Sequence, residues 1–318
     1  MRTAYVALAL IGLAVSLAIH EAYRTDMADA QQRIVNGSHI LVTDYGDIEY
    51  AVQGNGPPVL LLHGSGGGYD QGLLLGRLAL VSDFRQIAVS RFGYLRSPVP
   101  ADASVAAQAA AYAALLDHLG VDRVIVLAGS GGGPSALQFA HDFPERTSAL
   151  ILVSAVSKVI PPGEQNALAL TIIQTIQRSD FLYWLAAKLF QSQFLTLIGL
   201  PREVFDQLTP DGQDLAQQML DVMHPMSLRR IGSFREGEQR PLDDAALGRI
   251  AAPTLILHAR DDSLVVFEHA EHAQRSIPRS TLVSFDTGGH GLVAQINTVR
   301  ERVSRFVNGV LLEAPAPP

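Results

Sequence analysis

Short, continuously apolar runs alternate with segments of helical periodicity along most of the chain. The run Pro58–Leu62 is apolar at every position, which is typical of a strand buried on both faces of a parallel sheet. Strands that alternate with helices predict a parallel sheet with right-handed crossovers, and hence the α/β fold class. The further strands expected are 86–89, 123–127, 149–153, 253–257 and 281–285, and the helices expected between or after them are 71–82, 104–119, 134–142 and 293–310.

The beginning of the sheet has a different pattern. Residues 38–44 and 48–52 are separated by a short turn at Tyr45-Gly46-Asp47, which predicts a pair of antiparallel strands. We expect this pair to form an antiparallel edge next to the parallel strands.

The alternation stops between Ser154 and about Ala246, where only helical patterns occur. This interval predicts a helical insertion at about 155–245 that forms a cap over the sheet. Five aromatic side chains in this interval are candidates for the lining of a substrate pocket, although most residues of this kind belong to a core. They are Phe181, Tyr183, Trp184, Phe190 and Phe194.

The first segment of the chain is directed to a membrane. Between Ala4 and Ile19 it is uncharged and almost wholly apolar, and this length falls between a signal-peptide core and the roughly 20 residues that cross a bilayer. An uncleaved anchor is the preferred interpretation. A cleaved signal is the alternative, because a cleavage-like triplet, Ala28-Asp29-Ala30, follows. A buried soluble helix is disfavoured because such helices are amphipathic and this one is apolar on every face.

The predicted organisation therefore has two parts. Residues 1–30 form a membrane anchor or signal segment, and residues 31–318 form the α/β domain with its helical cap insertion. An uncleaved segment would place the domain on a membrane, outside the cytoplasm. Cleavage would leave a periplasmic or secreted protein.

The composition of the chain argues against several classes of function. The chain of 318 residues has no cysteine, which excludes disulfides, thiolate catalysis and cysteine-bound zinc. The net charge is −7 and no Lys/Arg-rich run occurs, so nucleic acid is not an expected partner. The ten histidines are scattered without metal-ligand spacing, and we expect neither a metal nor a cofactor. His269 and His272 are expected on a solvated helix face.

The sharpest chemical signal is a buried strand that ends in Ala128-Gly-Ser130-Gly-Gly132 and is followed at once by a helix. A serine at such a turn is held in a strained conformation that needs small neighbours, and its hydroxyl projects above the sheet as a nucleophile. A glycine-rich turn of this kind can also bind a phosphate, as in a dinucleotide site. That alternative is weaker because the glycines do not follow the pattern GxGxxG.

A hydroxyl becomes a good nucleophile only when a base takes its proton, and a carboxylate must orient that base. A later strand runs into two adjacent carboxylates, Asp261 and Asp262. The last predicted strand is followed by a histidine between glycines, His290. The expected triad is therefore Ser130, one of these two aspartates and His290, in the chain order serine, acid, histidine.

These residues, together with His63-Gly-Ser65-Gly-Gly-Gly68, resemble the α/β-hydrolase superfamily over roughly residues 38–310. The resemblance implies that Asp262 is the acid, with Asp261 in reserve, and that His63 is structural. The backbone N–H groups of Ser65 and Gly131 are predicted to bind the oxyanion. The loop Ser90-Arg-Phe-Gly-Tyr-Leu-Arg-Ser97 departs from the pattern Asp-x-Arg-Gly-x-Gly-x-Ser of many members, which leaves the subfamily unassigned.

The predicted function is hydrolysis of an ester, thioester or lactone in a small acyl substrate through an acyl-enzyme. The serine argues against haloalkane dehalogenases and epoxide hydrolases, which resemble this chain but use an aspartate nucleophile. Two alternatives stay open. One is a C–C bond hydrolase acting on a diketone with the same triad, and the other is a ligand-binding receptor built on the same fold.

Overall fold

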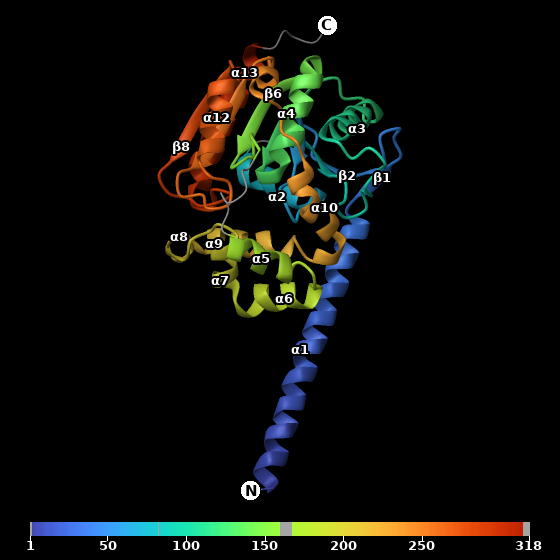
Figure 1. Cartoon of the computed structure of the whole chain (residues 1–318), viewed down its shortest axis with the longest axis vertical. Coiled ribbons are helices and arrows are strands. Elements are labelled where there is room, and N and C mark those ends of the chain that lie inside the picture. Colours follow the sequence, from blue (N-terminus) through green and yellow to red (C-terminus); the bar gives the residue numbers. More distant parts are fainter. Residues whose placement is uncertain (1, 82, 160–166, 314–318) are drawn as a thin grey trace.

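One eight-stranded sheet forms the centre of the protein (Figure 1). The computed structural model describes residues 2–81, 83–159 and 167–313. The strands are β1 (His39–Leu41), β2 (Ile48–Gln53), β3 (Pro58–Leu62), β4 (Arg85–Ser90), β5 (Val124–Gly129), β6 (Thr147–Val153), β7 (Thr254–Ala259) and β8 (Ser280–Phe285).

The strand order is β1-β2-β4-β3-β5-β6-β7-β8. β2 is antiparallel to both β1 and β4, and every other neighbouring pair is parallel. The predicted α/β class, with a mostly parallel sheet and an antiparallel edge, is confirmed.

Helices cover both faces of the sheet. One face carries α3 (Val105–His118), α4 (Gly133–Asp142), α11 (Asp244–Leu247) and α12 (Glu268–Ser276), and the other carries α2 (Tyr69–Ala79) and α13 (Ile296–Glu313). Successive strand residues point to opposite faces, so Leu60 and Leu62 join the first core whereas Val59 and Leu61 join the second. This burial on both sides explains why the strands are apolar without alternation.

The parallel strands bring several loops to one edge of the sheet. β3, β5, β6, β7 and β8 all run in the same direction, so the segments that follow them lie at the same, carboxyl edge. In open α/β sheets this edge is where ligands bind. The predicted site residues all follow these strands, and the cap starts from β6.

The cap contains helices but no strand among its described residues. They are α5 (Ala167–Ile176), α6 (Asp180–Leu189), α7 (Gln191–Leu197), α8 (Arg202–Asp206), α9 (Pro210–Asp221), α10 (Arg230–Arg235) and the 3₁₀ turns η3 (Met226–Leu228) and η4 (Glu236–Glu238). Residues 160–166 of the predicted cap lie outside the described residues. The cap has its own apolar core, which includes Tyr183, Phe194, Leu220 and Met226.

Buried ion pairs attach the cap to the sheet domain. Arg229, between η3 and α10, is fully buried and donates to both carboxylate oxygens of Asp70 on α2, at 2.9 and 2.7 Å. It also donates to the carbonyl oxygen of Gly67 at 2.8 Å. A bidentate Arg–Asp pair in a dry environment has a defined geometry, so it fixes the cap's last segment on the core.

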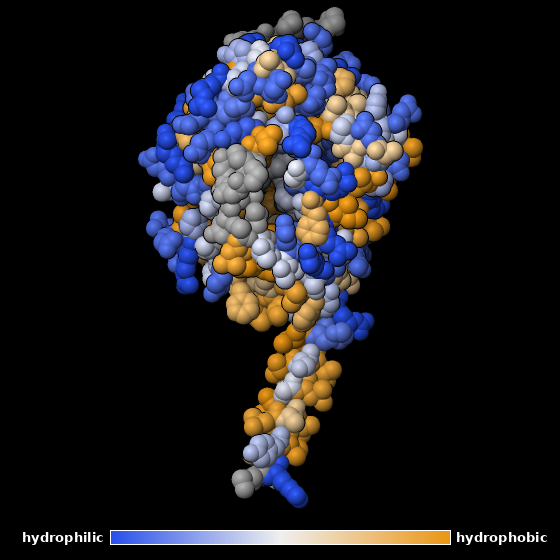
Figure 2. Space-filling model, in the orientation of Figure 1, coloured by the Kyte–Doolittle hydropathy of each residue, from blue (hydrophilic) through white to orange (hydrophobic). Residues whose placement is uncertain are grey.

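A single long helix, α1 (Arg2–Asn36), forms the N-terminal part of the chain. Its first half projects away from the body (Figure 1), and the face seen in Figure 2 is mostly apolar. An 18-residue window within it has a mean hydropathy of 2.0, long and apolar enough to serve as a signal or an anchor. The helix continues past the predicted boundary at residue 30, and its last turns pack on the body, where Ala30 and Ile34 are buried.

If the end of α1 belongs to the folded body, its buried side chains must contribute to stability. Ile34 is 1% exposed and its neighbour Val35 is 58% exposed. We expect Ile34→Ala to lower the free energy of unfolding by about 2–5 kcal/mol, since it leaves a cavity, and Val35→Ala to have little effect. Chemical denaturation of the full chain in detergent measures both. Equal effects of the two substitutions would contradict the packing described.

Candidate active site

Ser130 stands at a sharp turn between a strand and a helix. β5 ends at Gly129, Ser130 opens the 3₁₀ turn η1 (Ser130–Gly132), and its φ is 50°, a left-handed conformation that is rare outside glycine. Its carbonyl oxygen accepts a hydrogen bond from Val156 N at 3.0 Å. A β-carbon on Gly64 would lie 2.9 Å from Ser130 Cβ. A β-carbon on Gly132, one of the two small neighbours expected from the sequence, would lie 2.6 Å from the carbonyl oxygen of Leu62. The turn therefore has the strained conformation expected of it.

His290 and Asp262 are in direct contact. Asp262 follows β7 and is buried, and His290 follows β8. The Nδ1 of His290 and the Oδ2 of Asp262 are 2.9 Å apart. The other carboxylate oxygen, Oδ1, accepts hydrogen bonds from the backbone N–H groups of Leu264 and Val265, each at 3.0 Å. The carboxylate is thereby held in one orientation, and it orients the imidazole in turn.

Asp261, the reserve candidate for the acid, has a different environment. Its carboxylate accepts hydrogen bonds from Gly289 N at 2.8 Å and Gly288 N at 3.2 Å. It therefore ties the loop after β7 to the loop after β8. The structure brings Asp262, and not Asp261, to the imidazole of His290.

The charges of this pair shift both pKa values. Burial opposes the charged form of each group. For His290 the neighbouring Asp262 carboxylate outweighs burial, through its charge and its hydrogen bond, and raises the pKa of the imidazole above its usual value. For Asp262 burial is outweighed by the charge of His290 and by hydrogen bonds from His258, His290 and Val265 N, so its pKa lies well below the usual range.

The loop after β3 is held on both sides of Ser65. Gly64 N donates to the side-chain oxygen of Gln71 at 2.8 Å, and Gly66 N donates to Ser233 Oγ of the cap at 2.9 Å. Ser65 itself is exposed. Gly66 has a φ of 70°, and a β-carbon there would lie 2.4 Å from Met223 Cε, so this position needs glycine.

His63 lies beneath this loop, as expected. It is fully buried, its Nδ1 donates to the carbonyl oxygen of Gly64 at 2.7 Å, and its Nε2 accepts from Arg91 N at 3.0 Å. Burial, followed by the charge of Arg91, holds its pKa well below the usual range. A neutral imidazole with both nitrogens occupied in this way has a structural role.

The sequence did not indicate the role of Glu236, a cap residue next to the Ser130 turn. A β-carbon on Gly131 would lie 2.8 Å from its Oε2. The carboxylate is paired with the buried guanidinium of Arg91 and accepts a hydrogen bond from the Tyr94 hydroxyl. Arg91 and Tyr94 belong to the loop that departs from the common family pattern. The pairing was not predictable, because nothing in the local sequence relates Glu236 to that loop.

The expectation of an exposed His269 was wrong. His269 is 0% exposed, and its Nδ1 accepts a hydrogen bond from Ser157 N at 3.2 Å. Burial lowers the pKa of His269 to about 4. The reason is that α12 packs this side against the sheet, while the chain leaving β6 covers it. His272 is half-buried and contacts Asp244 at 2.7 Å.

Two cavities lie away from the candidate residues. One of about 350 Å³ lies between α1 and the cap, and one of about 410 Å³ lies between α3, α4 and the end of the cap. Neither is lined by Ser130, Asp262 or His290. Within residues 2–81, 83–159 and 167–313, no group of three or more His, Asp or Glu side chains is arranged to hold a metal ion.

Comparisons with known proteins agree with this architecture. Residues 57–295 match the family described as alpha/beta hydrolase fold. An uncharacterized hydrolase, YcgS, of Bacillus subtilis is 31% identical over 78% of this chain and 89% of its own length. A putative carbamate hydrolase, RutD, of Pseudomonas savastanoi is 28% identical over 73% of this chain and 86% of its own length.

A solved alpha/beta hydrolase fold protein from Nakamurella multipartita is also similar. It is 31% identical, with a TM-score of 0.72, over 86% of this chain and 99% of its own. The chain therefore belongs to the α/β-hydrolase fold family, and it is a hydrolase of that fold.

The contact between His290 and Asp262 should be visible in the titration of the His290 imidazole. Because the carboxylate stabilises the imidazolium, we expect His290 to titrate above pH 6.5, the ordinary value for histidine. Asp262→Asn removes that charge, so the pKa of His290 should fall. NMR of ¹³C-labelled histidine side chains measures both, and His290→Gln assigns the resonance. An unchanged midpoint in Asp262→Asn would refute the electrostatic coupling.

Proposed function

We propose that the protein hydrolyses an ester-type bond with Ser130 as nucleophile, His290 as base and Asp262 as the acid that orients the base. The observation that carries the proposal is the 2.9 Å contact between His290 Nδ1 and Asp262 Oδ2, at the sheet edge that also holds the strained turn of Ser130. With Nδ1 engaged, Nε2 is the nitrogen that can take the serine proton.

The proposed reaction has two halves. Ser130 Oγ attacks the carbonyl carbon while its proton moves to His290, and the N–H groups of Ser65 and Gly131 bind the oxyanion. The intermediate collapses, the leaving group takes the proton from His290, and an acyl-enzyme remains. Water then attacks the acyl carbon and gives a proton to His290, and His290 passes this proton to Ser130 Oγ as the acid is released.

The proposed substrate is an ester, a thioester or a lactone. A carbamate belongs in the same screen, because the Pseudomonas relative is named as a putative carbamate hydrolase. The surroundings of the triad come from both parts of the protein. A β-carbon on Gly199 of the cap would lie 2.5 Å from His290 Cβ, and Glu236 approaches Gly131. We infer that specificity depends on the cap.

Labelling of the full chain with a fluorescent fluorophosphonate tests the nucleophile. Ser130→Ala and His290→Ala should abolish labelling and lower kcat for an acyl ester by on the order of 10⁶-fold, and Asp262→Asn by about 10⁴-fold. Ser65→Ala is the matched control, because it keeps the backbone N–H, so its rate should change little.

Two results would count against this mechanism. Absence of labelling in folded wild-type protein would remove the activated serine and favour a binding role. Turnover of a vinylogous 1,5-diketone without turnover of any ester would replace ester hydrolysis by C–C bond hydrolysis on the same triad.

We also propose that α1 stays attached and anchors the protein in a membrane. The cleavage-like triplet at residues 28–30 lies inside the continuous helix, and Ala30 is buried against the body. Cleavage there would remove Asp26, which accepts a hydrogen bond from Trp184 Nε1 at 2.8 Å. These contacts support a helix that is part of the mature protein.

Membrane extraction of the expressed full chain tests this anchor. We expect the protein to resist a carbonate wash and its mass to include residues 1–30. Leu10→Arg combined with Leu13→Arg should release it, since each charge at the centre of a span costs about 2.5–3.5 kcal/mol. The matched pair Leu10→Ala and Leu13→Ala should remain bound. A mature protein that begins after Ala30 would refute the anchor.

A further inference from the structure

The cap presents apolar side chains to solvent on α5, on α6 and at the residue after α6. Six of them, which we call the cap base, have exposed fractions between 39% and 70%. Figure 2 shows apolar atoms gathered at the end of the body from which α1 projects, and Figure 1 shows α5 and α6 at that end. An exposed patch of this kind marks an interaction surface. The six residues are Leu168, Ile172, Phe181, Leu182, Leu189 and Phe190.

The cap base lies close to the level at which α1 leaves the body. The ring of Tyr23 on α1 makes edge contacts with Phe181 at 5.3 Å and with Trp184 at 5.7 Å between centroids. Tyr23 is four residues beyond Ile19, the last residue of the apolar segment, or about 6 Å along the helix axis. The headgroup layer on each side of a bilayer is about 5–7 Å thick. The start of α6 therefore stands at headgroup depth when Ile19 lies at the edge of the hydrocarbon.

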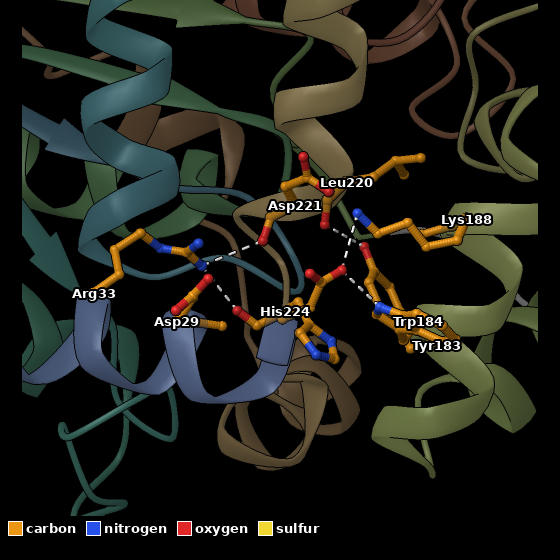
Figure 3. A pocket seen from close by; sticks show the side chains of 11 residues that line it. Asp29, Arg33, Tyr183, Trp184, Lys188, Leu220, Asp221 and His224 are labelled. Atoms are coloured by element: carbon orange, nitrogen blue, oxygen red, sulfur yellow. Dashed lines mark hydrogen bonds and ion pairs between the residues drawn. The ribbon is translucent and has the colours of Figure 1, made fainter. Parts of the chain in front are cut away.

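Further polar contacts hold the last turns of α1 against the cap. Asp26 pairs with Lys188 Nζ at 3.1 Å in addition to its bond from Trp184. Arg33 donates to the carbonyl oxygens of Asp221 at 3.2 Å and His224 at 2.9 Å, across the cavity of about 350 Å³ between helix and cap (Figure 3).

No linker separates the apolar segment from the body, because α1 is one continuous helix from Arg2 to Asn36. A body joined to its anchor in this way cannot rotate freely above the membrane. Its orientation follows from the direction of α1, and that direction places the cap base on the membrane side.

We propose that the cap base rests in the interface of the bilayer that α1 spans, so that the catalytic domain sits with its cap against the lipid. The proposal depends on the anchoring role of α1. The occupant is a lipid bilayer because the patch lies at the end of the body from which the apolar half of α1 projects (Figure 2), and because the ring of Tyr23 lies at the junction, where tyrosine suits the membrane interface. The contact is apolar, so a zwitterionic bilayer suffices.

The absence of cysteine from the chain makes a clean test possible. The full chain carrying a single Phe190→Cys or Leu189→Cys substitution is labelled with the fluorophore NBD and reconstituted into phosphatidylcholine vesicles. A second set of vesicles contains lipid with a nitroxide on carbon 5 of the acyl chain. The matched control is Leu311→Cys on α13, which is 40% exposed near the opposite end of the molecule. Fluorophosphonate labelling confirms that each variant is folded.

If the cap base contacts lipid, the nitroxide should quench the probes at 189 and 190 several-fold more than the probe at 311. Aqueous iodide should show the reverse order. Probes at 189 and 190 that iodide reaches as readily as the control would overturn the proposal. A second result would also overturn the proposal. In it, both quenchers fail to reach the probes, and energy transfer between probes on different copies rises with the ratio of protein to lipid. A second copy of the protein would then cover the patch.

Failure of the anchor itself is distinguishable from failure of this proposal. Vesicle flotation reports whether the full chain is bound at all. A chain that floats but keeps its 189 and 190 probes in water retains the anchor and loses only the contact of the cap base.

Discussion

Three chain segments approach one another around Ser130 at distances that leave no room for side chains. A β-carbon on Gly132 would lie 2.6 Å from the carbonyl oxygen of Leu62, and one on Gly133 would lie 2.1 Å from that of Val156. The ends of β3 and β6 are therefore packed directly against the turn that follows β5. The left-handed conformation of Ser130 persists because these neighbours hold it, and the site described above depends on this close packing.

The second constraint is electrostatic. A carboxylate as deeply buried as Asp262 needs partners, and it has His290, His258 at 3.4 Å, and two backbone N–H groups. These groups come from β7, from the loop after it and from the loop after β8. The ionised state of Asp262, and with it the raised pKa of His290, is therefore a property of the assembled sheet edge.

The cap contacts both the candidate site and the N-terminal helix α1. Its last segment is attached to the core by Arg229 with Asp70 and by Glu236 with Arg91, and both arginines are buried. On its other side the cap holds α1 through Trp184 and Lys188. Under the proposed anchoring, the cap that approaches the site through Gly199 and Glu236 also faces the membrane through α5 and α6. The cavity between α1 and the cap is lined by residues of these two parts and not by Ser130, Asp262 or His290.

Much of the fold and of the candidate site followed from local patterns. A strand buried on both faces must be apolar throughout, so the predicted runs correspond to β3, β4, β5, β6 and β7 within a few residues. The edge strand β8, which is only partly buried, was also found to within one residue. The serine turn was visible because it requires glycines at fixed positions. Which of two adjacent aspartates reaches His290 was open, since successive side chains leave the backbone in different directions. The structure pairs Asp262 with His290 and turns Asp261 to Gly288 and Gly289.

By itself, then, the sequence determined the order and type of the elements and the residues available for chemistry, because periodicity and turn geometry are local properties. Only the tertiary structure decided that His269 is buried, that Glu236 meets Arg91 beside Gly131, and that α1 extends past residue 30 to pack against the cap. These contacts join residues far apart in the chain. They exist only once the elements have packed, and no local pattern encodes which distant surface each side chain will meet.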